Sequence, residues 1–131
     1  MDGQNKVFIL VICCLNLIFI SGCSIISESD IRDVPVILIA PSDGVITSVS
    51  GQTFCWNYVD EATNYNLQIV SPGFDYIEKL VLDTALTSNK FSMTLDQGVY
   101  EWRVNAYNSG YQTQYTAYKL EIENTNSPSD Q

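Results

Sequence analysis

The sequence predicts an all-β protein whose globular part is a sandwich of seven antiparallel strands. Beyond Val34, apolar residues alternate with polar ones in short segments, and no stretch shows the 3.6-residue period of an amphipathic helix. Turn-forming residues, such as Pro-Ser-Asp-Gly at 41–44 and Asn-Ser-Gly at 108–110, separate the segments at intervals of about 10 to 15 residues. Short alternating segments between regular turns are typical of a β-sandwich.

Three strands are expected in the first half of the domain. Residues 36–39 form a continuous aliphatic run that ends at a turn, which indicates the first strand. Residues 53–58 predict the second strand, because Phe54 and Trp56 fall on one face of it. Residues 64–70 predict a half-buried third strand whose inward side chains are Tyr65, Leu67 and Ile69.

Four further strands complete the predicted sandwich. Residues 76–82 follow a break at Ser71-Pro72-Gly73 and alternate irregularly, which suits the edge of a sheet. Residues 90–95, 100–106 and 118–122 alternate more strictly, and each directs one set of apolar side chains inward. The structural core is therefore expected to contain Trp56, Tyr65, Leu95, Tyr100 and Trp102.

The N-terminus carries a targeting pattern. Residues 7–20 are uncharged and apolar except for Asn16, a length that suits the hydrophobic region of a signal peptide and falls short of a membrane-spanning helix. This run ends in a motif that resembles the bacterial lipobox, in which the thiol of the last residue receives diacylglycerol: Ile20, Ser21, Gly22 and Cys23. An uncleaved N-terminal anchor is the alternative interpretation.

The lipobox divides the chain into four predicted parts: a cleaved signal peptide at 1–22, a lipidated cysteine with a flexible acidic tether at 23–33, the sandwich at 34–124, and a disordered tail at 125–131. Two or more acyl chains on Cys23 would anchor the protein stably in the bacterial cell envelope. We expect the outer membrane in preference to the inner one. Acidic residues soon after the cysteine resemble an export signal of Bacteroidetes surface lipoproteins but begin late, so surface exposure stays open: Glu28, Asp30 and Asp33.

Composition excludes several functions. The chain has no histidine and a net charge of -9, so it lacks a Ser-His or Cys-His nucleophile pair and the clustered cations that nucleic-acid binding needs. Adjacent acidic residues at 60–61 suit a solvated loop better than a calcium site, so no metal or other cofactor is expected. If Cys13 and Cys14 leave with the signal and Cys23 is lipidated, only Cys55 remains, as an inert core thiol.

Motifs along residues 34–124 carry a family resemblance. They are Pro41-x-Asp43-Gly44, Trp56, Ala62-x-x-Tyr65-x-Leu67 and, above all, Leu95-x-x-Gly98-x-Tyr100-x-Trp102-Arg103-Val104-x-Ala106-x-Asn108. Together they resemble a fibronectin type III domain, an Ig-like sandwich. The resemblance implies a tyrosine corner, in which the Tyr100 hydroxyl bonds back to the backbone across a turn. The chain is also similar to the N-terminal domains of Bacteroidetes surface lipoproteins that take up glycans.

Exposed aromatic residues are the candidate ligand-binding groups, because their rings stack on sugar rings. One group flanks the turn before the last strand, and a second follows Pro72-Gly73: Tyr107, Tyr111 and Tyr115, then Phe74 and Tyr76. The alternative is that these side chains only cover cross-strand neighbours. Arg103 points outward and is expected to pair with an acidic residue across the sheet.

The sequence therefore predicts a lipid-anchored, non-enzymatic interaction or binding module of the bacterial envelope. Its expected partners are the membrane, through the lipid on Cys23, and either another envelope protein or a glycan. Two alternatives stay open: a glycan-binding accessory protein of a polysaccharide-uptake system, and a structural spacer in an envelope complex.

Overall fold

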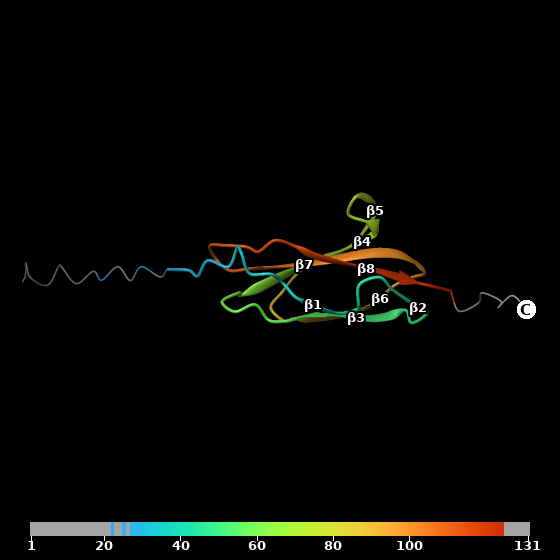
Figure 1. Ribbon diagram of the computed structural model, residues 1–131, viewed down its shortest axis with the longest axis horizontal. Helices are drawn as coiled ribbons and strands as arrows, with labels where there is room; N and C mark the ends of the chain where they lie inside the picture. Colours follow the sequence, from blue (N-terminus) through green and yellow to red (C-terminus); the bar gives the residue numbers. More distant parts are fainter. Residues whose placement is uncertain (1–21, 23–24, 26, 125–131) are drawn as a thin grey trace, which may run out of the picture.

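The structure is a computed structural model that describes residues 22, 25 and 27–124 (Figure 1). Eight strands form two facing sheets: β1 (Leu38–Ala40), β2 (Val45–Thr47), β3 (Gly51–Trp56), β4 (Asn64–Gly73), β5 (Tyr76–Leu86), β6 (Lys90–Thr94), β7 (Gly98–Tyr107) and β8 (Thr116–Ile122). One sheet has the order β1-β3-β6 and the other has the order β2-β8-β7-β4-β5. The predicted all-β sandwich is confirmed. The predicted signal segment, apart from Gly22, and Cys23 and the tail lie outside the described residues.

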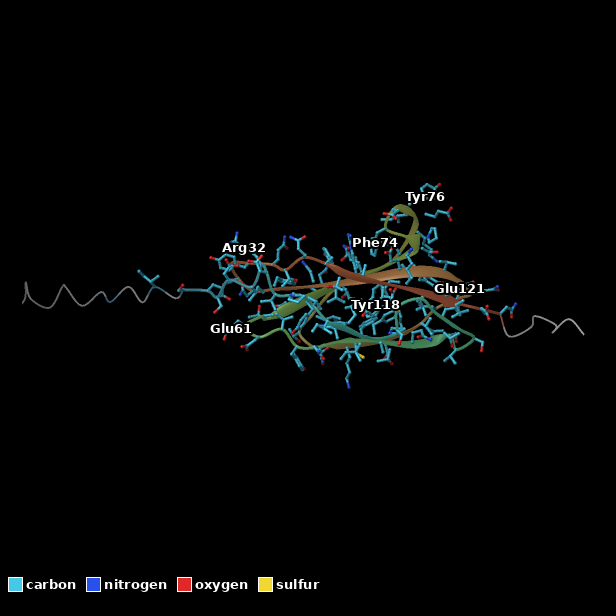
Figure 2. All side chains as sticks on the ribbon, in the orientation of Figure 1. Arg32, Glu61, Phe74, Tyr76, Tyr118 and Glu121 are labelled. Carbon is cyan, nitrogen blue, oxygen red and sulfur yellow. The ribbon has the colours of Figure 1, made fainter. Side chains whose placement is uncertain are left out.

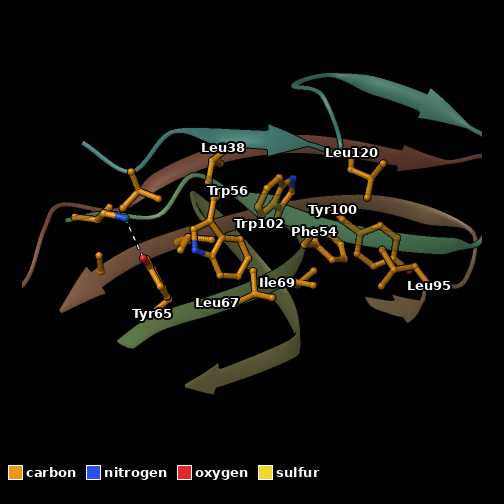
Figure 3. Close-up of a cluster of buried hydrophobic side chains, with 14 of the residues drawn as sticks. Leu38, Phe54, Trp56, Tyr65, Leu67, Ile69, Leu95, Tyr100, Trp102 and Leu120 are labelled. Atoms are coloured by element: carbon orange, nitrogen blue, oxygen red, sulfur yellow. Dashed lines mark hydrogen bonds between the residues drawn. The ribbon is translucent and has the colours of Figure 1, made fainter. Parts of the chain in front are cut away.

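The core lies between the two sheets and is built on aromatic side chains (Figure 3). Trp56 and Trp102 are both 0% exposed. The ring of Phe54 meets the ring of Trp102 edge-on at 5.0 Å between centroids, which joins β3 of one sheet to β7 of the other. Trp56 and Tyr65 make a similar contact at 5.6 Å. Leu95 and Tyr100 are buried as well, so all five residues expected in the core lie there.

The turn between β6 and β7 forms the tyrosine corner that the family resemblance implies. The Tyr100 hydroxyl donates a hydrogen bond of 2.8 Å to the carbonyl oxygen of Asp96. Burial and, to a smaller extent, the charge of Asp96 raise the pKa of Tyr100 above its usual value of 10.0. The neutral phenol is therefore the form that the fold favours.

The structure adds one strand to the predicted seven. β2 lies at the edge of the five-stranded sheet and pairs with β8 in parallel, so the prediction that all strands are antiparallel is wrong for this pair. Two bonds join the preceding turn to β8: Gly44 N donates to the Lys119 carbonyl oxygen, and Lys119 N donates to Asp43 Oδ1, both at 2.8 Å. Three residues are too few to show a sequence period, so only the tertiary contact with β8 identifies this strand.

The expected break at Ser71-Pro72-Gly73 is also wrong. β4 continues to Gly73 and pairs with β5 until Gly73 lies opposite Tyr76, so the turn of this hairpin is at residues 74–75. The pairing register shifts between Ser71 and Pro72, and proline is accommodated at such an irregularity because its missing N–H is not needed there. β5 is an edge strand, as predicted, and the hairpin tip projects from the sandwich (Figure 1).

Two further expectations are corrected. Ile31, placed by the sequence in the tether, is only 2% exposed, so the packed domain begins before residue 34. Cys55 is half-buried on the opposite face of β3 from Phe54 and Trp56, so its thiol is not part of the core. Within the described residues, the structure contains no helix long and apolar enough to cross a membrane.

Candidate functional site

The outer face of the five-stranded sheet carries an arginine in contact with two aromatic rings. Arg103 lies on β7, opposite Gln68 of β4 and Ala117 of β8. The Cζ atom of Arg103 is 3.9 Å from the centroid of the Phe74 ring and 4.3 Å from the centroid of the Tyr115 ring. A guanidinium over the face of an aromatic ring is attracted by the ring quadrupole, so both contacts help to hold Arg103 in place.

Hydrogen bonds connect this arginine with polar side chains of two neighbouring strands. Arg103 Nε donates to Gln68 Oε1 at 2.8 Å, and Gln68 Nε2 donates to Asp83 Oδ2 at 3.1 Å. Asn66 Nδ2 lies 3.1 Å from Asp83 Oδ1 and 3.0 Å from the Tyr115 hydroxyl oxygen. These contacts close a ring of five side chains, and Phe74 contacts the ring at Arg103. We call the whole set the Arg103 cluster: Asn66, Gln68, Phe74, Asp83, Arg103 and Tyr115.

The tip of the β4–β5 hairpin brings Phe74 to the cluster. Phe74 N donates a hydrogen bond of 2.7 Å to Glu101 Oε2, which ties the hairpin to β7. A Cβ atom on Gly73 would lie 2.9 Å from the same oxygen, so the absence of a side chain at this position permits the contact. Figure 2 shows Phe74 and Tyr76 at this projecting hairpin.

Arg103 does not pair with an acidic residue of the described part of the chain, so the expectation that it would pair across the sheet is wrong. Within the described residues, no carboxylate oxygen lies within 4.0 Å of its guanidinium nitrogens, and only Nε has a hydrogen-bond partner. The nearby carboxylates of Asp83 and Glu101 accept hydrogen bonds from amide groups. On the same face of β7, the buried Asn105 Oδ1 has no donor among the described residues. The polar groups around Arg103 are therefore not fully satisfied within this part of the chain.

A second arginine–aromatic contact lies at the end of the sandwich where the chain enters. Arg32 Cζ is 5.3 Å from the centroid of the Tyr111 ring, and Arg32 Nη2 pairs with Asp30 Oδ2 at 2.7 Å. Hydrogen bonds from Arg32 lower the pKa of Asp30 to about 2. We call residues 28–33 the N-terminal strap, because Ile31 is buried and its neighbours Ser29 and Arg32 contact the loop before β8.

Asn108 fastens this strap to the domain. Asn108 is 7% exposed, and its Nδ2 donates to the Ser29 carbonyl oxygen at 2.8 Å and to the Glu61 carbonyl oxygen at 3.3 Å. Its Oδ1 accepts hydrogen bonds from the backbone N–H groups of Gly110 and Tyr111. The Asn-Ser-Gly turn that the sequence marks only as a chain reversal therefore also holds the strap.

The structure regroups the aromatic residues that the sequence singled out. Phe74 and Tyr115, which the sequence assigned to separate groups, meet at Arg103. Tyr111 contacts Arg32 of the strap, Tyr107 is half-buried, and Tyr76 on the hairpin is 70% exposed. The sequence did not mark three polar members of the cluster, and its only signal for them is an outward position on a strand: Asn66, Gln68 and Asp83.

The remaining predicted sites concern the lipid anchor and metals. Gly22 of the lipobox is exposed, whereas Ile20, Ser21 and Cys23 lie outside the described residues. Among the residues that the structure covers, no three His, Cys, Asp or Glu side chains converge on a point that suits a metal ion. The acidic pair at Asp60 and Glu61 is exposed, and the Glu61 carbonyl oxygen accepts a hydrogen bond from Asn108.

The two sheets, the tyrosine corner and the strand order define a fibronectin type III-like sandwich. The chain is similar to the solution structure of the fn3 domain of human collagen alpha-1(XX) chain, with a TM-score of 0.54, 16% identity, and coverage of 82% of this chain and 99% of that one. It is also similar to fibronectin(III)-like modules of Clostridium thermocellum CbhA, with a TM-score of 0.51, 12% identity, and coverage of 69% and 98%. Such low identities show the fold alone.

Comparison by sequence adds no relative. No protein-family model matches the chain, and no curated protein matches it. The fibronectin type III fold is common among interaction and binding modules, and its members are typically non-enzymatic. The function must therefore be argued from the residues of the domain.

Proposed function

We propose that this chain is a non-enzymatic, lipid-anchored binding module of the bacterial cell envelope. The observation that carries the proposal is the run Ile20-Ser21-Gly22-Cys23, which matches the lipobox at all four positions and stands shortly before a packed sandwich. Lipid on Cys23 would hold the domain at the membrane and raise the local concentration of its recognition surface there. The outer membrane is the proposed location.

The place where the strap docks supports a particular orientation. The strap lies at one end of the sandwich, where Figure 2 shows Arg32 and Glu61, and the β4–β5 hairpin projects from one face nearer to the other end (Figure 1). A tether that leaves through the strap would turn the loop with Tyr111 toward the membrane. The Arg103 cluster would then lie on the side of the domain, on the outer face of the five-stranded sheet, where a partner has access.

Metabolic labelling tests the anchor. A palmitate analogue should label the wild-type protein, and the label should be lost in Cys23→Ser, because the thiol is the proposed attachment point. The Cys55→Ser variant is the matched control and should retain the label. Equal labelling of wild type and Cys23→Ser would show that the lipobox assignment is wrong.

A glycan-binding accessory protein of a polysaccharide-uptake system is the second candidate. The Arg103 cluster favours it, since aromatic rings beside amide and carboxylate groups suit the faces and hydroxyls of sugars. Calorimetric titration of residues 27–131 against a glycan panel tests this function. Tyr115→Ala should abolish the heat, and Tyr111→Ala should leave it unchanged, because Tyr111 contacts Arg32 of the strap and not the Arg103 cluster.

A structural spacer in an envelope complex is the alternative to ligand binding. Cross-linking in cells followed by mass spectrometry separates these functions. A spacer requires one dominant protein partner and no small ligand. Recovery of one such partner, together with no heat from any glycan, would favour the spacer over the binding module.

A further inference from the structure

We propose that Arg103 is an anion-binding centre and that its ligand is a saccharide that carries a carboxylate, such as a uronic acid. The proposal rests on the glycan-binding function proposed above and names the ligand class of the same site. It follows from three properties of Arg103: its fixed position, the lack of a carboxylate partner among the residues that the structure describes, and the mixture of polar groups around it.

The guanidinium is held in place before any ligand binds. One hydrogen bond fixes Nε, at 2.8 Å from Gln68 Oε1, and two aromatic rings contact the group at 3.9 and 4.3 Å from Cζ. A group that is already ordered loses little conformational freedom when it binds, so more of the contact free energy appears as affinity. The two Nη nitrogens have no partner among the described residues. They offer the planar pair of donors that fits a carboxylate bidentately.

The charge of Arg103 is available to a ligand, in contrast to that of Arg32. Arg32 contacts Tyr111 but also pairs with Asp30 at 2.7 Å. Arg103 is less exposed than Arg32 and has no carboxylate within 4.0 Å in the described part of the chain. Since the chain carries a net charge of -9, general attraction does not favour an anion, and the binding must come from the local contact with Arg103.

The neighbours of Arg103 favour an acidic sugar over an acidic peptide. Asp83 and Glu101 lie on the same face, so a ligand with many negative charges would meet like charges. The Asp83 carboxylate accepts one hydrogen bond on each oxygen and can accept more. A uronic acid brings one carboxylate for Arg103 and several neutral hydroxyls that can donate to these acceptors.

Titration of the mature chain, residues 23–131 with Cys23→Ser, tests the proposal. The probes are trimers of galacturonic, glucuronic and mannuronic acid, each compared with its neutral counterpart. At least one acidic trimer should bind at least tenfold more tightly than its counterpart. Arg103→Gln should weaken that binding by about 10- to 100-fold, the worth of a charge-assisted hydrogen-bond pair. Arg103→Lys should also weaken it by about tenfold, because lysine keeps the charge and loses the fork.

Arg32→Gln is the matched control and should change the affinity less than twofold. Equal binding of acidic and neutral trimers, full binding by Arg103→Gln, or no binding of any acidic trimer at millimolar concentration would each overturn the proposal. Tighter binding of triglutamate than of every acidic trimer would overturn it in favour of an acidic peptide. None of these results affects the labelling of Cys23, so the lipid anchor stands or falls separately.

A measurement on the wild-type chain covers the case in which the Arg103 variants do not fold. The Nε–Hε resonance of Arg103 should shift when the preferred acidic trimer saturates the protein, because the guanidinium gains a charged partner. The corresponding resonance of Arg32 should not move. An unshifted Arg103 resonance in a saturated complex would contradict the proposal.

Discussion

The domain uses arginine beside an aromatic ring in two places, and the two places differ in how the charge is neutralised. Arg32 lies near Tyr111 and pairs with Asp30, a residue only two positions away in the chain. Arg103 contacts Phe74 and Tyr115 and has no carboxylate partner among the described residues. The first contact joins the N-terminal strap to the loop before β8. The second leaves a positioned charge that a ligand can neutralise.

The two places also differ in how they are assembled. The Asp30–Arg32 pair is local and sits on an exposed segment, whereas the Arg103 cluster joins three strands and two loops. Local, exposed ion pairs contribute little to stability. The geometry of the cluster, in contrast, depends on the pairing of β5 with β4 and of β4 with β7. Changes to the core should therefore disrupt both regions, and changes to the strap should affect only one.

The largest effect is expected for Trp102→Ala. Trp102 is fully buried directly before Arg103 on β7, and its loss should reduce the free energy of unfolding by about 3 to 5 kcal/mol. Such a loss approaches the total stability of a small domain, so the strap and the cluster should be lost together. Denaturant unfolding measures the change. A cooperative melt at the wild-type midpoint would mean that this tryptophan does not support the core.

Ile31→Ala should affect the N-terminal strap and leave the Arg103 cluster intact. Ile31 is a buried side chain of the strap, and its truncation should reduce stability by about 2 kcal/mol, at the low end for a core residue. Amide exchange should become faster at Val34, whose N–H bonds to the Ile31 carbonyl oxygen, and at Tyr111, whose N–H bonds to Asn108. Amide exchange in β4 and β7 should become faster only by the amount that the loss of global stability explains. Selectively faster exchange beside Arg103 would show that the regions are coupled.

Tyr100→Phe changes the tyrosine corner, which belongs to neither the N-terminal strap nor the Arg103 cluster. It removes the hydrogen bond to the Asp96 carbonyl and should reduce stability by about 1 kcal/mol. Because the pKa of Tyr100 is raised in the fold, its contribution is fully present below the unfolded value of about 10 and is lost as pH rises through the folded value. Between about pH 8 and pH 11, a range that brackets the reference pKa of tyrosine, the free energy of unfolding should therefore fall less in the variant than in wild type. If the free energy of unfolding fell equally with pH in the two proteins, Tyr100 would not stabilise the fold through its neutral phenol.

The smallest effect concerns the titration of Asp30. Its pKa of about 2 lies below the ordinary 3.8, so its contribution to stability is present above pH 3.8 and is lost as pH falls through about 2. Arg32→Gln should raise the titration midpoint of the Asp30 carboxyl carbon, measured by NMR, toward 3.8. Arg103→Gln should leave the midpoint where it is. A midpoint near 3.8 in the wild-type chain would show that the pair does not form in solution.

Most of the sandwich could be predicted from the sequence because its strands obey one local rule. Burial on one side of a sheet produces a period of two, and that period is visible in β3, β4 and β7 without knowledge of any partner strand. β2 escaped prediction because three residues carry no period. The end of β4 was misplaced because proline usually interrupts a strand and is tolerated here only at a register shift against β5.

The sequence by itself determined the alternating core, the lipobox-like run and the absence of histidine, because each is a property of single residues or of their spacing. The tyrosine corner was expected from the family resemblance, and the bond from Tyr100 to the Asp96 carbonyl confirms it. Only the tertiary structure decided that Phe74 and Tyr115 meet at Arg103, and that Ile31 belongs to the domain. The reason is that the cluster joins residues far apart in the chain, such as Asn66 and Tyr115 at a separation of 49 positions, and no local pattern encodes which outward side chains become neighbours.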